Sequence, residues 1–217
     1  MTTIAIYSDL ICPWCYIGKR RMELALQQLP AGTEVVRSWH PFQLNPHLPR
    51  KGLDRKIYRT EKFGSWAESL ALDERITATG KKVGIEFRYD LQTHTPNTFD
   101  SHRLVWLAGR SGMQDAVVEA LFRAYFCEGA NFSDQAKLIE IGASAGLDAK
   151  ELKRFFTGDE GVSAVRAEEQ QAAGLHISGV PFYLVNNTVR ISGAQPPEIF
   201  LEALRTTHAD KISNATA

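Results

Sequence analysis

The feature that most constrains the fold of this chain is a pair of cysteines placed where a strand gives way to a helix. The motif Cys12-Pro13-Trp14-Cys15 directly follows an alternating, partly β-branched segment, residues 3–8, that predicts a strand. Proline suits the first position of a helix, because its fixed φ matches and its missing N–H would be unpaired there anyway. We therefore predict a helix that begins at the Cys-Pro step and carries both cysteines on its first turn.

Strand signals occur only near the two ends of the chain. A second strand is predicted at residues 33–42, after Pro30-Ala31-Gly32 has ended the first helix, so the chain opens as β-α-β. The next strand patterns come at 181–186 and 188–192, with Asn186-Asn187 as a hairpin turn between them. A final helix then completes a β-β-α pattern at the C-terminal end.

The long middle of the chain carries helical patterns. The clearest runs from Met113 to Tyr125, where apolar residues recur every three or four positions, as on an amphipathic helix. Ser133 and Asp148 are the expected N-caps of two further helices. If the two ends of the chain pair into one sheet, the fold is a thioredoxin-like α/β domain with a long all-helical insertion. We expect the discontinuous domain and the insertion domain to have these bounds: 1–43 with 175–217, and 44–174.

Composition and charge narrow the functional classes. Twenty-five basic residues balance 25 acidic ones without a block of like charge, which argues against nucleic acid as the main partner. No apolar run reaches the length of a membrane span, and the first residues lack the basic segment of a secretory signal. We therefore expect a cytoplasmic protein, in which a close cysteine pair is more often catalytic or metal-binding than structural.

The position of the pair at a helix N-terminus favours redox chemistry. If Cys12 is the N-cap, its sulfur can accept hydrogen bonds from free N–H groups of the first turn, including that of Cys15, and the helix dipole also favours its thiolate. Residues three apart on a helical turn lie within disulfide reach. We expect Cys12 to be the exposed nucleophile and Cys15 to be the more buried resolving thiol.

Two other interpretations of the cysteines remain open. The pair could be half of a zinc site, although zinc normally takes four ligands, and the chain offers one further cysteine, Cys127, and no histidine pair at zinc-finger spacing. The pair could also be two inert core cysteines. Cys127 continues the apolar face of its predicted helix, so we expect it to be a buried, inert thiol.

A proton-transfer partner for the cysteines is not evident from the pattern. Asp9 precedes the motif by three residues, and His40 lies near the end of the second predicted strand. We expect each to be a structural polar residue. Asn97 and His102 either face the cleft from the insertion or simply cap and coat a helix.

A second signal is the proline that opens a predicted strand in Gly179-Val180-Pro181-Phe182. Geometry alone permits proline at the start of a strand or on an edge strand, so this position has a purely structural explanation. A cis bond before Pro181 is the other interpretation, although cis is the minority state of X–Pro bonds.

These motifs together resemble the DsbA-like oxidoreductases, and most closely their FrnE-type branch. The resemblance spans nearly the whole chain and is carried by these segments: Ser8-Asp9, Cys12 to Lys19, Asn97 to Leu104, Gly179 to Phe182, and Ser192-Gly193-Ala194-Gln195-Pro196. It implies a thioredoxin domain with a helical insertion, dithiol–disulfide exchange by Cys12 and Cys15, and a cis-proline loop facing them. On this basis we expect substrate to contact the backbone and side chains of Pro13, Trp14, Val180 and Pro181.

The expected function is that of a thiol–disulfide oxidoreductase or isomerase, which forms a mixed disulfide with a thiol- or disulfide-containing protein or small molecule. The alternative is a glutathione-dependent transferase or a 2-hydroxychromene-2-carboxylate isomerase of the same fold. Those relatives carry serine at the leading active-site position, whereas Cys12 and Cys15 are both present here. We expect no metal and no organic cofactor, with glutathione left open as a co-substrate.

Overall fold

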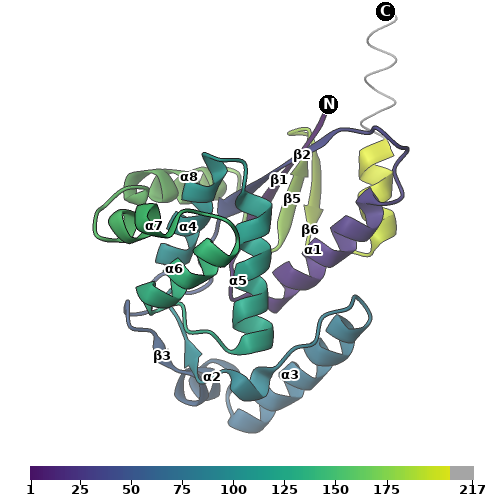
Figure 1. Ribbon diagram of the computed structural model, residues 1–217. Coiled ribbons are helices and arrows are strands. Elements are labelled where there is room, and N and C mark those ends of the chain that lie inside the picture. Colours follow the sequence, from purple (N-terminus) through teal and green to yellow (C-terminus); the bar gives the residue numbers. More distant parts are fainter. Residues whose placement is uncertain (206–217) are drawn as a thin grey trace, which may run out of the picture.

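A four-stranded sheet forms the centre of the protein (Figure 1). The computed structural model describes residues 1–205, so the final residues of the predicted discontinuous domain, 206–217, lie outside the described part. The strands run in the spatial order β2-β1-β5-β6. Their bounds are Thr2–Ser8 for β1, Val35–Pro41 for β2, Phe182–Val185 for β5 and Val189–Ser192 for β6.

The two ends of the chain meet in this sheet. Strand β1 pairs in parallel with β2 and antiparallel with β5, which places Ile4 opposite Val185. Asn186 and Asn187 both adopt positive φ, which is the backbone that a tight hairpin turn between β5 and β6 requires. The β-α-β and β-β-α halves predicted from the sequence therefore form one thioredoxin-like sheet.

Helix α1 (Pro13–Leu26) and the helical residues 197–205 lie together beside the sheet in Figure 1. Gly18 allows α1 to approach β5 closely, because a Cβ built there would lie only 2.2 Å from the hydroxyl oxygen of Tyr183. The Tyr183 ring in turn packs edge-on against Phe200, with ring centroids 4.8 Å apart. These contacts fix the helix that carries the cysteines against the sheet.

The segment between β2 and β5 is mainly helical. Its helices are α2 (Arg55–Phe63), α3 (Trp66–Lys81), α4 (Phe99–Gly109), α5 (Gln114–Glu128), α6 (Gln135–Ser144), α7 (Ala149–Phe156) and α8 (Val162–Gly174), with a 3-10 turn at Tyr89–Leu91. Helices α4, α5 and α8 contact β2, while α2 and α3 form a layer beneath the N-terminal end of α1 in Figure 1.

Two details of this segment differ from the sequence prediction. A short antiparallel ribbon pairs β3 (Leu53–Asp54) with β4 (His94–Thr95), and the prediction of an entirely helical segment missed it, because two-residue strands have no periodicity. The expected cap Ser133 is replaced by Asp134, whose carboxylate accepts the N–H of Ala136 at 2.9 Å. Asp148 caps α7 as predicted, and it accepts the N–H of Glu151 at 2.8 Å.

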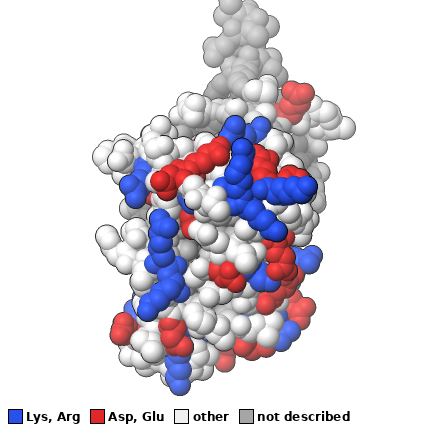
Figure 2. Space-filling model, turned by 60° about the vertical axis from the view of Figure 1, so that its left-hand side comes forward, with Lys and Arg blue, Asp and Glu red and all other residues white. Residues whose placement is uncertain are grey.

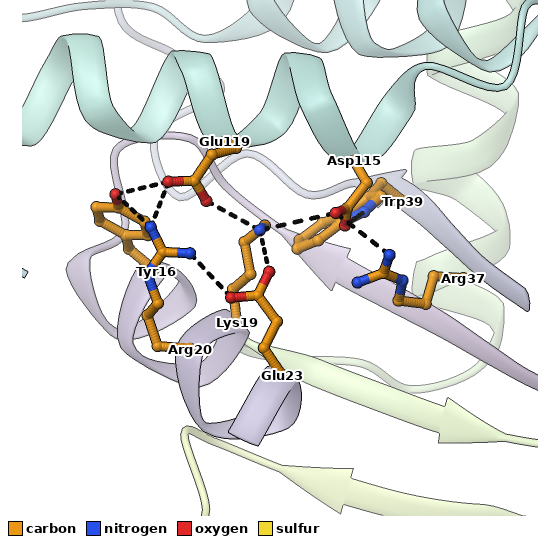
Figure 3. Close-up of polar contacts among 8 residues, drawn as sticks. All are labelled: Tyr16, Lys19, Arg20, Glu23, Arg37, Trp39, Asp115 and Glu119. Carbon is orange, nitrogen blue, oxygen red and sulfur yellow. Dashed lines mark hydrogen bonds and ion pairs between the residues drawn. The ribbon is translucent and has the colours of Figure 1, made fainter. Parts of the chain in front are cut away.

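A network of charged side chains joins α1 to α5 (Figure 3). The ammonium group of Lys19 is buried between carboxylates, 2.9 Å from Oε2 of Glu119 and in contact with Glu23 of its own helix. Arg20 also pairs with Glu119, and its guanidinium lies 5.0 Å from the centre of the Tyr16 ring. The buried cation is therefore matched by anions from both helices, which is the condition under which a buried charge is tolerated.

Charges on the visible outer face are mixed in sign. Basic and acidic side chains are interspersed over the face shown in Figure 2, without a broad area of one sign. Within residues 1–205, no helix has both the length and the apolar character needed to cross a membrane.

Candidate functional site

The two cysteines lie at the N-terminal end of α1. Cys12 is the N-cap residue with extended backbone, Pro13 follows it at the start of the helix, and the N–H of Cys15 donates to the carbonyl oxygen of Cys12 at 3.0 Å. Both are free thiols. Cys12 is 4% exposed, so it is less accessible than predicted, but it borders a cleft, whereas Cys15 is 1% exposed and does not line it.

The sulfur of Cys12 makes a different contact from the one predicted. We expected it to accept hydrogen bonds from the first turn of the helix, but its side chain makes no capping bond. Its S–H instead donates to the carbonyl oxygen of Val180, at a sulfur–oxygen distance of 3.7 Å. A protonated thiol has a hydrogen to donate and is a weak acceptor, so a carbonyl partner suits the reduced form.

Cys15 is held in its protonated form by its surroundings. Burial raises the pKa of the Cys15 thiol well above its ordinary value of 9.0. A hydrogen bond with Cys12, and the negative charge of Cys12 when it is ionised, raise this pKa further. The Ser8 hydroxyl and the Asp9 backbone act in the opposite direction but are weaker. The free thiol of Cys15 is therefore neutral at physiological pH.

This pKa difference predicts a pH-dependent stability of the reduced protein. Above pH 9.0 the thiol of Cys15 ionises in the unfolded chain but stays protonated in the fold, so unfolding releases a proton and is favoured as pH rises. The reduced protein should lose up to about 1.4 kcal/mol of stability per pH unit through Cys15 between its unfolded and folded pKa values.

Urea titrations of the reduced wild type and of Cys15→Ser between pH 8 and pH 11 measure this contribution as the difference between the two proteins. Tyrosines that are buried in the fold also ionise in this range once the chain unfolds, and the comparison cancels their contribution because both proteins contain them. If the free energy of unfolding depended on pH in the same way in both proteins, the prediction would be contradicted.

The loop before β5 faces the N-terminal end of α1. The Val180–Pro181 peptide bond is cis, and the carbonyl oxygen of Pro181 accepts the N–H of Gly193 at 2.8 Å. Cys12, Pro13, Trp14 and Val180 line one cleft of about 320 Å³, in which Trp14 is 41% exposed. Four residues selected from the sequence thus share one cavity, and Pro181 adjoins it through Val180.

The opposite wall of this cleft comes from α2 and was missed by the sequence analysis. Arg55, Arg59 and Lys62 line it together with Tyr58 and Phe63. The spacing of the three basic residues at i, i+4 and i+7 places them on one helical face, which is a signal the sequence does contain. The pattern alone could not show that this face is turned toward Cys12.

The polar residues considered as proton-transfer partners have separate structural contacts. Asp9 is fully buried, and its carboxylate accepts the N–H of Leu44 at 2.7 Å and lies 3.6 Å from Nε2 of His102. His40 lies 3.0 Å from the carboxylate of Glu168 and stacks on Tyr7.

Asn97 lies away from the cleft beside Cys12. Its amide donates to the carbonyl oxygen of Leu48 at 2.8 Å, and its own oxygen accepts the N–H of Phe99 at 2.9 Å. It lines a different cavity, with Arg50 and Asp100. Neither Asn97 nor His102 lines the cleft beside Cys12, and His102 lies instead against the buried carboxylate of Asp9.

Cys127 is half-buried on α5, not fully buried as expected. Burial raises the pKa of its thiol, and the charges of Glu128 and Glu119 raise it further. Within the described residues, no group of three or more His, Cys, Asp or Glu side chains is arranged to hold a metal ion.

Comparison with known proteins gives a consistent family. The model of the DSBA-like thioredoxin domain family matches residues 3–205. A probable DsbA oxidoreductase from Streptomyces coelicolor is 33% identical, with a TM-score of 0.89 over 96% of this chain and 91% of its own. The uncharacterized protein YwbO of Bacillus subtilis (strain 168) is 27% identical over 93% of this chain and 94% of its own.

A more distant structure shares the fold. The cytosolic disulfide reductase DsbM from Pseudomonas aeruginosa, solved with GSH, is 17% identical, with a TM-score of 0.63 over 95% of this chain and 99% of its own. The family match spans nearly the whole described chain and includes the cysteine pair and the Val180–Pro181 loop. The chain therefore belongs to the DSBA-like thioredoxin domain family.

Proposed function

We propose that this protein is a cytoplasmic thiol–disulfide oxidoreductase that acts through Cys12 and Cys15, in the FrnE-type branch of its family. The observation that carries the proposal is the dithiol at the N-terminal end of α1, with one sulfur bordering a cleft and the other buried behind it. In this setting the sulfur of Cys12 can be reached by substrate from the cleft.

The two thiols have different access, and this difference supports the roles proposed for them. The thiolate of Cys12 attacks one sulfur of a substrate disulfide, forms a mixed disulfide and releases the other sulfur as a thiolate. The Cys15 thiol then gives its proton to the released substrate thiolate, and its sulfur attacks the sulfur of Cys12, which closes the protein disulfide and releases the second half of the substrate as a thiolate. Two electrons pass from the protein dithiol to the substrate, and the reverse sequence oxidises a substrate dithiol.

The Val180–Pro181 loop is proposed to align the substrate. The carbonyl oxygen of Val180 already contacts the sulfur of Cys12, and Pro13, Trp14 and Val180 lie in the same cleft. An extended substrate chain beside the sulfur would pair with the backbone of Val180, as chains that add to a sheet edge do. Pro181 has no N–H to offer a substrate, and its carbonyl oxygen already accepts the N–H of Gly193. Its backbone therefore holds the loop in place and does not compete with Val180 for the substrate.

The direction of exchange follows from the proposed setting. The name of DsbM describes it as cytosolic, and the cytosol holds glutathione at a reducing potential, where net reduction or isomerisation of disulfides is favoured over oxidation. Glutathione is the proposed small thiol that returns the protein disulfide to the dithiol. Neither a metal nor an organic cofactor is required for these steps.

The proposal is tested by single-turnover reduction of a model disulfide with pre-reduced protein. The expected result is two thiols lost from the protein for each disulfide reduced, with a reversible two-electron couple when the protein is equilibrated against glutathione buffers. A glutathione transferase or isomerase would instead retain its activity in Cys15→Ser. One zinc ion per protein in the purified sample, released when the free thiols are lost, would instead support a metal site.

A further inference from the structure

The cleft beside Cys12 has an unusual charge composition. Its lining includes three basic side chains, Arg55, Arg59 and Lys62, and none of the described residues that line it is an aspartate or glutamate. This contrasts with the chain as a whole, in which basic and acidic residues are equal in number. The excess of positive charge is therefore a local property of the cavity that contains the reactive sulfur.

The two arginines share a single carboxylate behind the cleft wall. Arg55 donates to Oδ2 of Asp73 at 2.6 Å, and Arg59 donates to Oδ1 of the same residue at 2.7 Å. One negative charge thus faces two positive ones, all of them at least partly buried. Burial lowers the pKa of Arg59, which is the effect of desolvating a cation that its neighbours do not fully compensate.

Lys62 adds a third cation at the rim of the cleft. Its ammonium donates to the hydroxyl of Tyr58 at 2.8 Å and to Oδ1 of Asn45 at 3.1 Å, and neither partner carries a negative charge. An ammonium group has three N–H donors, so these two bonds leave one for a ligand. Lys62 is exposed at this rim, where an incoming molecule would meet it first.

Most of the remaining lining is apolar, and the space suits a small molecule. Trp14, Leu44, Phe63, Leu72 and Val180 contribute to it, and the volume of about 320 Å³ lies at the lower end of the range for small-molecule sites. An apolar cavity with a few converging cations binds a compact ligand that has an apolar body and one or more anionic groups.

We propose that this cleft selects small disulfides that carry carboxylate groups, which it holds through Lys62 and Arg59 with the disulfide bond against the sulfur of Cys12. This inference rests on the proposed function and names the substrate class of the same site. The reaction balances without a further reagent: one carboxylate-bearing disulfide and the protein dithiol give two carboxylate-bearing thiols and the Cys12–Cys15 disulfide.

The test compares three model disulfides of different charge in single-turnover kinetics with pre-reduced protein. The probes are the dianionic dithiobis-nitrobenzoate, the neutral dithiodipyridine and the dicationic cystamine. The variant is Lys62→Gln, with Lys62→Arg as the conservative replacement. Lys56→Gln is the matched control, because Lys56 is an exposed lysine on the same helix that does not line the cleft.

Because intrinsic reactivity differs among the probes, the readout is the ratio of rate constants for the anionic and the neutral disulfide. Lys62→Gln should lower this ratio about fivefold, the effect of removing an exposed cation that pairs directly with the carboxylate. Lys62→Arg should keep the wild-type ratio, and Lys56→Gln should change it less than about twofold. Added salt should lower the ratio in the wild type.

The outcomes separate this inference from the proposed function. If Lys62→Gln slows all three probes by the same factor, or if Lys56→Gln lowers the ratio equally, the cleft does not select anions, although the protein is still an oxidoreductase. If the wild type reduces none of the probes, including the neutral one, the proposed function itself fails.

Discussion

Replacing Cys12 with serine should lower the rate of disulfide exchange by more than about 1,000-fold. A serine hydroxyl stays protonated at neutral pH and cannot attack a disulfide, and Cys15 cannot replace Cys12 because it is 1% exposed and does not line the cleft. The measurement is single-turnover reduction of dithiodipyridine by the reduced protein, followed through the absorbance of the released thiol.

Cys15→Ser is the informative companion to this variant. Its Cys12 can still form the mixed disulfide, but nothing resolves it, so a covalent adduct of one protein with one substrate half should accumulate and be visible by mass spectrometry. Cys127→Ser is the matched control, since Cys127 lies on α5 outside the cleft and should be dispensable. Full exchange activity in Cys12→Ser would overturn the assignment of the nucleophile.

Replacing Gly18 with alanine should destabilise the fold by about 2–3 kcal/mol, the cost of overpacking a tight core contact. The new Cβ would lie 2.2 Å from the hydroxyl oxygen of Tyr183 and 3.2 Å from Cγ of Pro181, so α1 or the loop before β5 must shift. Tyr183 is fully buried and cannot swing into solvent. Chemical denaturation of the reduced protein measures the loss.

A second substitution identifies the cause of that loss. The hydroxyl of Tyr183 has no hydrogen-bond partner in the described structure, so Tyr183→Phe alone should cost little. Combined with Gly18→Ala it removes the colliding oxygen and should recover about 1–2 kcal/mol. The contact with Pro181 remains, so recovery should be partial. Strictly additive effects of the two substitutions on the free energy of unfolding would show that the collision with the Tyr183 hydroxyl is not the source of the lost stability.

The sequence predicts the sheet well because each of its strands has a local signal. Alternation predicts β1 and β2, and the pair Asn186-Asn187 predicts the hairpin, since asparagine tolerates the positive φ that both residues adopt. The β3–β4 ribbon has no such signal, because each strand is two residues long and is defined by its partner. Pairing between distant segments is a tertiary property that a local pattern does not contain.

The same difference between local signals and tertiary contacts decides which parts of the candidate site could be predicted from the sequence. The motif from Cys12 to Cys15 is contiguous, so its chemistry follows from spacing and from the helix start that Pro13 favours. The basic wall of the cleft is separated from it by some 40 residues of chain and is brought there by the packing of α2 and α3 under α1. Likewise, the bond from Cys12 to Val180 joins residues 168 positions apart, so its geometry required the structure.

The ion network between α1 and α5 makes the helix that carries the two cysteines and the helical segment parts of one cooperative unit. If α5 separated from α1, the ammonium of Lys19 would lose Glu119 and keep only Glu23 of its own helix as an anionic partner. Partial opening of the insertion should therefore be rare compared with global unfolding, and amides of both helices should exchange with solvent at a common rate. A protease would then meet a molecule that is either intact or wholly open, and no folded fragment that keeps the cysteine pair would survive.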